Sequence, residues 1–341
     1  MHRRSFVRSA APTVVVILIV FTAGAHPALA GTFSIGPTAG SVFGSATGFF
    51  DDDLLAPGPV AGLQAIGAGV PSVNVNAVTF GHTGITSLAA IAGVEFSVAH
   101  GSFGVAGTAL AAQVAAGEAG ADIFHTALGG SNTLLLDGDA AGPGPIAPPM
   151  GVFEPTTPPP PLARPDDVDA WDTRLLPPAG SPVYFSIDST TGTSDAVFVG
   201  PAGAGYDTGG VFYAGVVPLG LSVFPGVNDI DGLVVVDNDG LPLTFTPGVD
   251  LVFFSLTVGS VALAPSGATA GDILVDPAGA ALLGIAAPPG LPGIAFTEAS
   301  MGIATALSEL DGFDFLIVPE PSAVVLALVG FVGLLVLRRR C

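Results

Sequence analysis

The sequence predicts an all-β protein built from degenerate repeats of short strands, arranged as a small β-propeller or as a β-sandwich. Glycine and proline contribute 48 and 31 of the 341 residues and interrupt the chain every few positions, which marks turns. The short apolar runs between them are rich in Val, Phe, Ile and Thr, as strands are. Half of the residues are hydrophobic, so the chain can bury a core despite its net charge of −20.

The individual elements follow from these runs. Strand-like composition is found at 73–80, 93–105, 181–188, 232–237, 250–258 and 271–276. Helical composition is found at 107–117 and, more weakly, at 301–310.

Three copies of a degenerate repeat organise these strands. Each copy has a Phe-Ser strand, then an apolar strand led by an aspartate, then an acidic pair around one apolar residue. In chain order the members are Phe96-Ser97, Asp122 and Asp167/Asp169; Phe185-Ser186, Asp195 and Asp229/Asp231; and Phe254-Ser255, Asp272 and Glu309/Asp311. We expect each acidic pair to open the first strand of the next unit. A worn copy from Phe50 onwards would bring the total to four or five units.

A proline-rich segment at 142–165 interrupts the repeat. Four consecutive prolines, Pro158 to Pro161, favour a stiff polyproline-II conformation. Because the first repeat copy straddles this segment, we interpret it as a surface excursion within one exported region, 31–317.

The exported region is strongly acidic. All 28 acidic residues lie between Gly31 and Glu320, together with only two basic residues, Arg164 and Arg174, and no lysine. Such an anionic field argues against nucleic acid as a partner and favours cations such as calcium. The region also contains no cysteine, so disulfides do not stabilise it.

The first thirty residues are typical of a secretory signal peptide. Arg3, Arg4 and Arg8 precede a short apolar run at 14–21, and Ala28-Leu29-Ala30 is a small-x-small cleavage site before Gly31. The run is too short for a permanent span, which takes about 20 residues. The sequence therefore predicts export with cleavage after Ala30.

The C-terminus has three parts in series. Val318-Pro319-Glu320-Pro321-Ser322 cannot continue a helix, an uncharged apolar helix is expected at 323–337, and Arg338, Arg339 and Arg340 favour the cytoplasmic side. In order, spacing and position, residues 318–341 resemble the PEP-CTERM sorting signal of Gram-negative bacteria that make extracellular polysaccharide. The resemblance implies a temporary membrane anchor that an exosortase cuts near Pro319–Pro321, leaving the mature part at the cell surface, the outer membrane or the extracellular matrix.

Paired aspartates are the recurrent polar feature of the exported region. In a strand, an Asp-x-Asp pair places both carboxylates on one face. Three interpretations stay open: aspartates that close turns, calcium ligands, or a catalytic pair. The candidate calcium ligands are Asp167, Asp169, Asp229, Asp231, Asp237 and Asp239.

Catalytic constellations are otherwise missing from the sequence. The exported histidines lack the spacing of a zinc site, and there is no Gly-x-Ser-x-Gly elbow. We expect a noncatalytic surface or exopolysaccharide-matrix protein, adhesive or calcium-binding. The alternatives are a secreted polysaccharide hydrolase that uses an aspartate pair, and a surface-binding module of the ice-binding kind. One tryptophan, Trp171, and three tyrosines offer few sugar-stacking platforms, and threonine shows no regular period.

Overall fold

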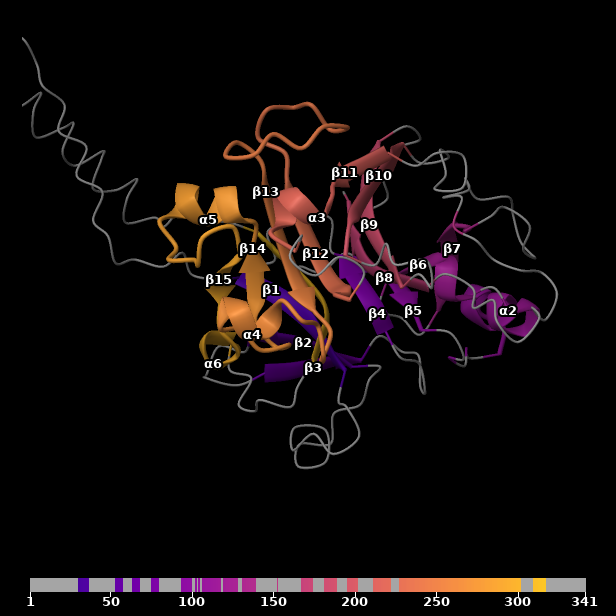
Figure 1. Ribbon diagram of the computed structural model, residues 1–341. Coiled ribbons are helices and arrows are strands. Elements are labelled where there is room, and N and C mark those ends of the chain that lie inside the picture. The colour runs from indigo at the N-terminus through magenta and orange to yellow at the C-terminus, as the bar shows by residue number, and fades with distance from the viewer. Residues whose placement is uncertain are drawn as a thin grey trace, which may run out of the picture. The chain divides into compact units, whose positions relative to one another are not determined.

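A computed structural model describes residues 30–36, 53–57, 63–67, 75–79, 93–99, 102, 104, 106–117, 119–127, 131–138, 152, 167–173, 181–188, 195–201, 211–221, 227–301 and 309–316 (Figure 1). All of them belong to one compact unit, Leu29–Val318. The signal peptide up to Leu29, the proline-rich segment except Val152, and the whole sorting tail lie outside the described residues. No helix within the described ranges is long and apolar enough to cross a membrane.

The described chain is predominantly β, as predicted. Its strands form four antiparallel sheets of four strands each. One sheet has the order β16 (Glu309–Leu316), β1 (Ala30–Gly36), β2 (Asp53–Pro57), β3 (Leu63–Gly67). The next is β4 (Val75–Thr79), β5 (Val94–Val98), β6 (Ile123–Thr126), β7 (Asn132–Leu136). The third is β8 (Asp167–Asp172), β9 (Pro182–Asp188), β10 (Val197–Pro201), β11 (Val211–Ala214). The fourth is β12 (Ile230–Val236), β13 (Leu251–Leu256), β14 (Ile273–Val275), β15 (Gly293–Phe296).

Short helices occupy some of the connections. They are α2 (Ala109–Ala116), the 3-10 turn η2 (Ala119–Ala121), α3 (Val216–Leu219), α4 (Leu263–Ser266), α5 (Pro277–Leu283) and α6 (Glu298–Met301). The helix predicted at 107–117 is confirmed as α2. Thr108 caps its N-terminus by accepting a hydrogen bond from the Ala111 N–H, and Gly117 ends it at φ 86°, a conformation that favours glycine.

The helix predicted at 301–310 is wrong at its C-terminal end, and residues 302–308 lie outside the described residues. Helix α6 ends at Met301, and Glu309 and Leu310 instead begin the last strand, β16. Leu310 is fully buried beside Phe313 in the core of the fourth sheet. Tertiary burial therefore overrides the weak helical preference of this stretch.

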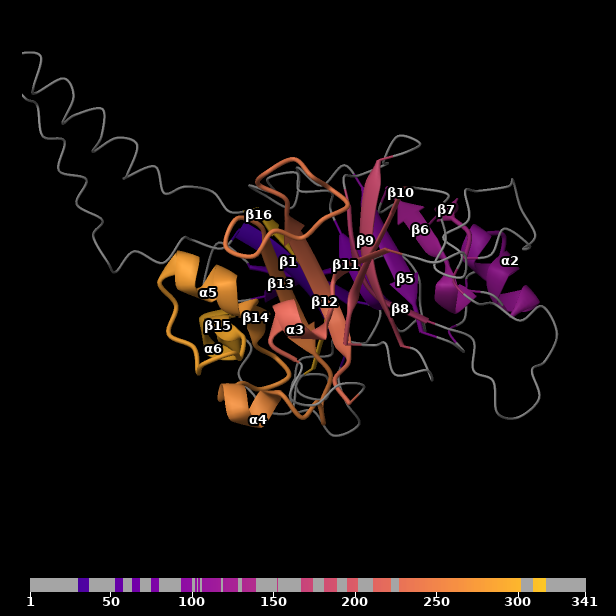
Figure 2. The same cartoon turned by 45° about the horizontal axis from the view of Figure 1, so that its top comes forward.

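The edge strands β4, β8, β12 and β16 connect the four sheets. They contact one another in a closed cycle, β4 with β8, β8 with β12, β12 with β16, and β16 with β4. The cycle closes because β16, the last strand of the described residues, pairs with β1, the first. Ala30 lies opposite Leu316 and Phe33 opposite Phe313 in the antiparallel pair β1–β16 (Figure 2).

The predicted repeat corresponds to this architecture. The Phe-Ser pairs lie in β5, β9 and β13, the second strand of each sheet. The leading aspartates directly precede the third strand, one or two residues before its first residue. The acidic pairs flank or open β8, β12 and β16, the first strands of the following sheets. The expectation that each acidic pair opens the next unit is thus confirmed.

The serines of the repeat join neighbouring sheets. The Oγ atoms of Ser97, Ser186 and Ser255 donate hydrogen bonds to the carbonyl oxygens of Val168, Ile230 and Leu310, at 2.5, 2.6 and 2.8 Å. All three serines are fully buried. Each bond therefore satisfies a buried carbonyl within the acidic pair of the next first strand.

The fourth copy of the repeat begins earlier than predicted. Phe33-Ser34 occupies β1, and Ser34 lies opposite Gly312. In the other sheets the serine likewise lies opposite a small residue, namely Ala77, Ala170 or Gly232. The N-terminal copy thus starts at Phe33, ahead of the expected Phe50.

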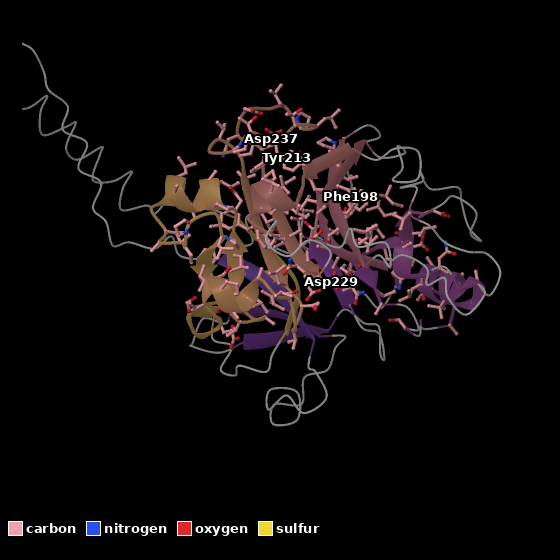
Figure 3. All side chains as sticks on the ribbon, in the orientation of Figure 1. Phe198, Tyr213, Asp229 and Asp237 are labelled. Atoms are coloured by element: carbon pink, nitrogen blue, oxygen red, sulfur yellow. The ribbon has the colours of Figure 1, made fainter. Side chains whose placement is uncertain are left out.

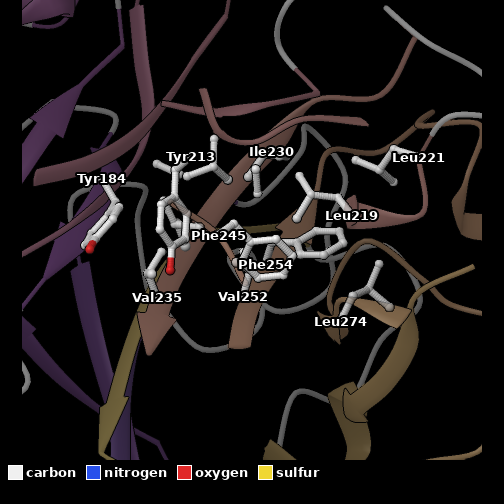
Figure 4. Close-up of a cluster of buried hydrophobic side chains, with 14 of the residues drawn as sticks. Tyr184, Tyr213, Leu219, Leu221, Ile230, Val235, Phe245, Val252, Phe254 and Leu274 are labelled. Atoms are coloured by element: carbon white, nitrogen blue, oxygen red, sulfur yellow. The ribbon is translucent and has the colours of Figure 1, made fainter. Parts of the chain in front are cut away.

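The core is divided among the sheets. The largest buried cluster lies around β12 and β13 and includes Tyr213, Leu219, Phe245, Phe254 and Leu274 (Figure 4). In the third sheet the rings of Phe185 and Phe198 stack with centroids 5.7 Å apart. Trp171 is buried in the same cluster as these rings.

Candidate metal site

Two of the aspartates that lead the third strands, Asp122 and Asp272, accept hydrogen bonds from main-chain N–H groups. The Asp122 carboxylate accepts a hydrogen bond from the Gly138 N–H at 3.0 Å. That of Asp272 accepts from the N–H groups of Thr269 and Glu298, at 2.9 and 2.7 Å. Gly138 lies two residues after the end of β7, and Glu298 lies two residues after the end of β15; each of these is the fourth strand of its sheet. These aspartates join the third strand of a sheet to the end of its fourth, as turn-forming aspartates do.

The acidic pairs lie at β-bulges in the first strands. Register shifts between Val168 and Ala170, and between Ile230 and Gly232, leave Asp169 and Asp231 as the extra residues. Asn76 holds the same position in β4, and its Nδ2 donates to Asp169 Oδ1 at 3.2 Å. Asp169, the second residue of its acidic pair, thus faces the junction between the first strands β4 and β8.

The structure separates the predicted calcium ligands into different places. Asp229 and Asp237 lie at opposite ends of β12 (Figure 3). The six residue-to-residue steps from Asp231 to Asp237 span roughly 20 Å of extended chain. Asp167 opens β8 in another sheet, and its side chain lies outside the described part. The six aspartates therefore do not form one site.

A candidate metal site lies in the loop that joins β12 to β13. Ligand atoms of Asp237, Asp239 and Asp250 all lie within 4.8 Å of one another, and no other such group occurs in the described ranges. Asp237 and Asp239 were predicted from the sequence, whereas Asp250 was missed. The signal for Asp250 was available, because two predicted strands end and begin at these residues and a hairpin between them brings Asp237 and Asp250 together.

Strand register explains the meeting of Asp237 and Asp250. Val236 lies opposite Leu251 in the antiparallel pair β12–β13. Asp237, which follows Val236, therefore faces Asp250, which precedes Leu251, across the hairpin. Like charges in such positions destabilise a sheet. Asp250 is fully buried, and none of the described residues is a lysine or an arginine that could offset its charge.

Hydrogen bonds fix the shape of this loop. Asp250 accepts from the N–H groups of Asn238 and Thr246, at 3.0 and 2.7 Å. Asp237 accepts from the Gly240 N–H at 2.7 Å. Asp239 accepts from the Leu241 N–H at 2.8 Å and from the Thr246 hydroxyl at 2.7 Å. Since a carboxylate has about four acceptor positions, each of the three retains lone pairs for a cation.

Three aromatic side chains hold the loop against the core. Phe245 comes from the loop itself and is buried against Tyr213, with centroids 5.7 Å apart. Tyr213 in turn contacts Tyr184 edge-to-face at 4.7 Å. The Tyr184 hydroxyl donates to the carbonyl oxygen of Pro242 in the loop, at 3.2 Å. The loop is therefore anchored at two points besides its ends.

The electrostatics of the site keep its tyrosines neutral and Asp239 charged. Burial raises the pKa of Tyr213 and of Tyr184 far above the ordinary value, and the nearby aspartates raise it further. Hydrogen bonds from the Thr246 hydroxyl and the Leu241 N–H lower the pKa of Asp239, and the nearby Asp237 side chain lowers it further. The site thus offers carboxylate and hydroxyl oxygens, the hard ligands that calcium and magnesium prefer.

Comparison of the chain with models of protein families, with curated proteins and with solved structures found no match.

Proposed function

We propose that the protein is an exported, noncatalytic component of the cell surface or exopolysaccharide matrix of a Gram-negative bacterium, delivered by exosortase-dependent sorting. The observation that carries the proposal is the position of both predicted cleavage sites beside the strand pair β1–β16. Cleavage after Ala30 would leave Gly31, opposite Phe315, as the first residue of the mature chain. The sorting motif begins at Val318, two residues after β16 ends.

Cleavage after Ala30 would remove only the Ala30–Leu316 pair, and the cut in the tail would leave β16 whole, so the other pairs between the two terminal strands would remain. Leu316 is separated from Pro319 by at most about 10 Å of chain, because one residue spans at most about 3.5 Å. The compact unit ends at Val318, where the tail resembling a PEP-CTERM signal starts. A body whose last strand ends beside the cutting site is suited to release from a temporary anchor without loss of structure.

We further propose that the four sheets are the blades of a four-bladed β-propeller. Four meanders, a closed cycle of first strands, and a last strand that completes the first sheet are the features that support this over a β-sandwich. A ring closed by β1 and β16 would stabilise a chain that has no disulfide in its exported part. It would also present loops outward, as a structural or adhesive module requires.

A noncatalytic role is supported by the aromatic side chains. Trp171, Tyr184 and Tyr213 are buried, with exposed fractions of 1, 5 and 4%, so they are not platforms for stacking sugars. The acidic pairs lie in strand bulges between sheets, where Asp169 takes a hydrogen bond from Asn76. These placements favour a structural use of the pairs over glycoside hydrolysis.

Expression of the full chain in Gram-negative hosts with and without an exosortase tests this function. With the enzyme, we expect a product that starts at Gly31, lacks the tail and is found at the surface or in the matrix. Without it, we expect retention in the inner membrane. Glu320→Ala should block processing, and the matched control Glu154→Ala, which alters a Glu-Pro pair outside the tail, should not.

Two results would overturn the proposal. One is a product of equal mass and location in both hosts. The other is hydrolysis of the host's exopolysaccharide by the purified product that is lost in Asp229→Ala or Asp231→Ala, which would favour the hydrolase.

A further inference from the structure

The loop Asp237–Asp250 is distinguished from its counterparts in the repeat. Asp250 lies five residues before the repeat serine of β13, Ser255. The residues at the same position before Ser186 and Ser97 are Ser181 and Ala92, which carry no charge. Asp250 is fully buried, and Asp237 lies opposite it where the hairpin opens. The unusual feature of this loop is therefore a concentration of negative charge at a partly buried hairpin end.

The spacing of the three carboxylates matches a single ion. Two oxygens that each lie about 2.4 Å from one calcium ion are at most about 4.8 Å apart. The ligand atoms of Asp237, Asp239 and Asp250 are all within 4.8 Å of one another. Magnesium, with bonds of about 2.1 Å and a strict octahedron, demands a tighter arrangement.

A buried hydroxyl group faces the same place. Tyr213 comes from β11 and is 4% exposed. Its buried hydroxyl oxygen makes no hydrogen bond with the residues that the structure describes, and it lies near Asp250 and Asp237. Figure 3 shows Tyr213 beside Asp237 at this end of β12. Because a buried polar group without a partner is costly, the hydroxyl indicates a ligand at this point.

We propose that Asp237, Asp239 and Asp250 bind one calcium ion, with the Tyr213 hydroxyl facing the ion or one of its water molecules. The ion would offset the like charges at the hairpin end, which no described lysine or arginine does. It would also tie both ends of the loop together and fix the exposed side chains of Leu241 and Leu243. This inference rests on the chemistry of the loop and is independent of the proposed sorting.

Calcium binding is tested on the full chain, purified in detergent and freed of metal with a chelator. Addition of CaCl2 should release or absorb heat in calorimetry and raise the melting temperature by several degrees, because the ion binds the folded state. Terbium, which resembles calcium in size and oxygen preference, should emit when excited through tyrosine. Tyr213→Phe should lose most of that emission.

Three variants separate an ion site from a merely structural loop. Asp237→Asn and Asp250→Asn should each weaken calcium binding at least tenfold. The matched control Asp272→Asn, a buried aspartate that also accepts two N–H bonds in the same sheet, should bind calcium like the wild type. Without calcium, Asp237→Asn should melt no lower than the wild type, since the amide oxygen retains the bond from Gly240 while the repulsion is relieved.

Either of two results would overturn the proposal. One is no heat and no shift in melting temperature up to about 10 mM CaCl2, above the dissociation constants typical of extracellular calcium modules. The other is undiminished binding in Asp237→Asn, which folds even if Asp250→Asn does not, and which would place the ion elsewhere on the acidic surface.

Discussion

The hydroxyl of Ser186 in β9 donates a 2.6 Å hydrogen bond to the carbonyl oxygen of Ile230 in β12, across the boundary between two sheets. Ile230 is the apolar residue within the acidic pair Asp229/Asp231, so the bond joins two members of the sequence repeat. Ser97 and Ser255 make the same bond to Val168 and Leu310. The repeat thus encodes a contact between neighbouring sheets as well as the strands within one sheet.

Removal of this hydroxyl should destabilise the protein. Ser186→Ala leaves the buried Ile230 carbonyl without its donor, and we expect the free energy of unfolding to fall by about 1–3 kcal/mol. Ser255→Ala should lower the free energy of unfolding by a similar amount. Ser300→Ala, at an exposed serine, should change the free energy of unfolding by less than about 0.5 kcal/mol. Urea unfolding followed by Trp171 fluorescence measures these differences. Equal stability of all three variants would refute a structural role for the repeat serine.

A methyl group at position 232 should also destabilise the junction of the sheets. The Cβ of an alanine there would lie 2.5 Å from Phe313 Cδ1 and 2.6 Å from Ser255 Oγ, so the neighbours must move. We expect Gly232→Ala to cost about 1–3 kcal/mol, as overpacking does. Gly215→Ala, where a Cβ meets nothing within 4 Å, is the control and should cost less than 1 kcal/mol. Thermal melts of both variants decide the matter.

The single tryptophan should report on the contact between the second and third sheets. Trp171 is 1% exposed, and its indole N–H donates to Glu95 Oε2 in β5 at 3.2 Å. We expect blue-shifted emission that moves to longer wavelength on unfolding. Glu95→Ala leaves the indole N–H unpaired and should cost at least about 1–3 kcal/mol, while Glu95→Gln keeps an acceptor and should cost less. The reverse order of stability would contradict this role of Glu95.

Buried Asp276 should make stability fall as the pH rises. Its carboxylate caps α5 through the Gly279 N–H and accepts a second bond from the Val252 N–H. Desolvation nevertheless raises its pKa. A raised folded-state pKa contributes stability that is fully present below the unfolded pKa of about 3.9 and lost as the pH rises through the folded pKa.

The difference in unfolding free energy between wild type and Asp276→Asn isolates this effect, because the asparagine does not titrate. We expect it to decrease in denaturant titrations as the pH rises above the ordinary aspartate pKa of about 3.9. Asp239→Asn is a control of opposite sign, since the pKa of Asp239 is lowered and its contribution is lost as the pH falls. A difference that increases with pH for Asp276 would show that its N–H bonds outweigh burial.

The sequence by itself determined the strands and the repeat. Alternating turns and apolar runs predict a β fold, and the recurrence of Phe-Ser, a leading aspartate and an acidic pair predicts units that begin with the acidic pair. These are local properties, because strand propensity, turn chemistry and repeat spacing are all read along the chain. The predicted ends of the chain likewise rest on local patterns, and they stay predictions that the processing experiment tests.

Only the tertiary structure decided which aspartates lie together. Asp231 and Asp237 are six residues apart in the sequence but at opposite ends of a strand, whereas Asp237 and Asp250 are thirteen residues apart and adjacent across a hairpin. The same holds for β16, whose residues were predicted as helix in part and instead pair with β1 at the other end of the chain. Pairing between distant strands depends on register and burial, which no single stretch of sequence specifies.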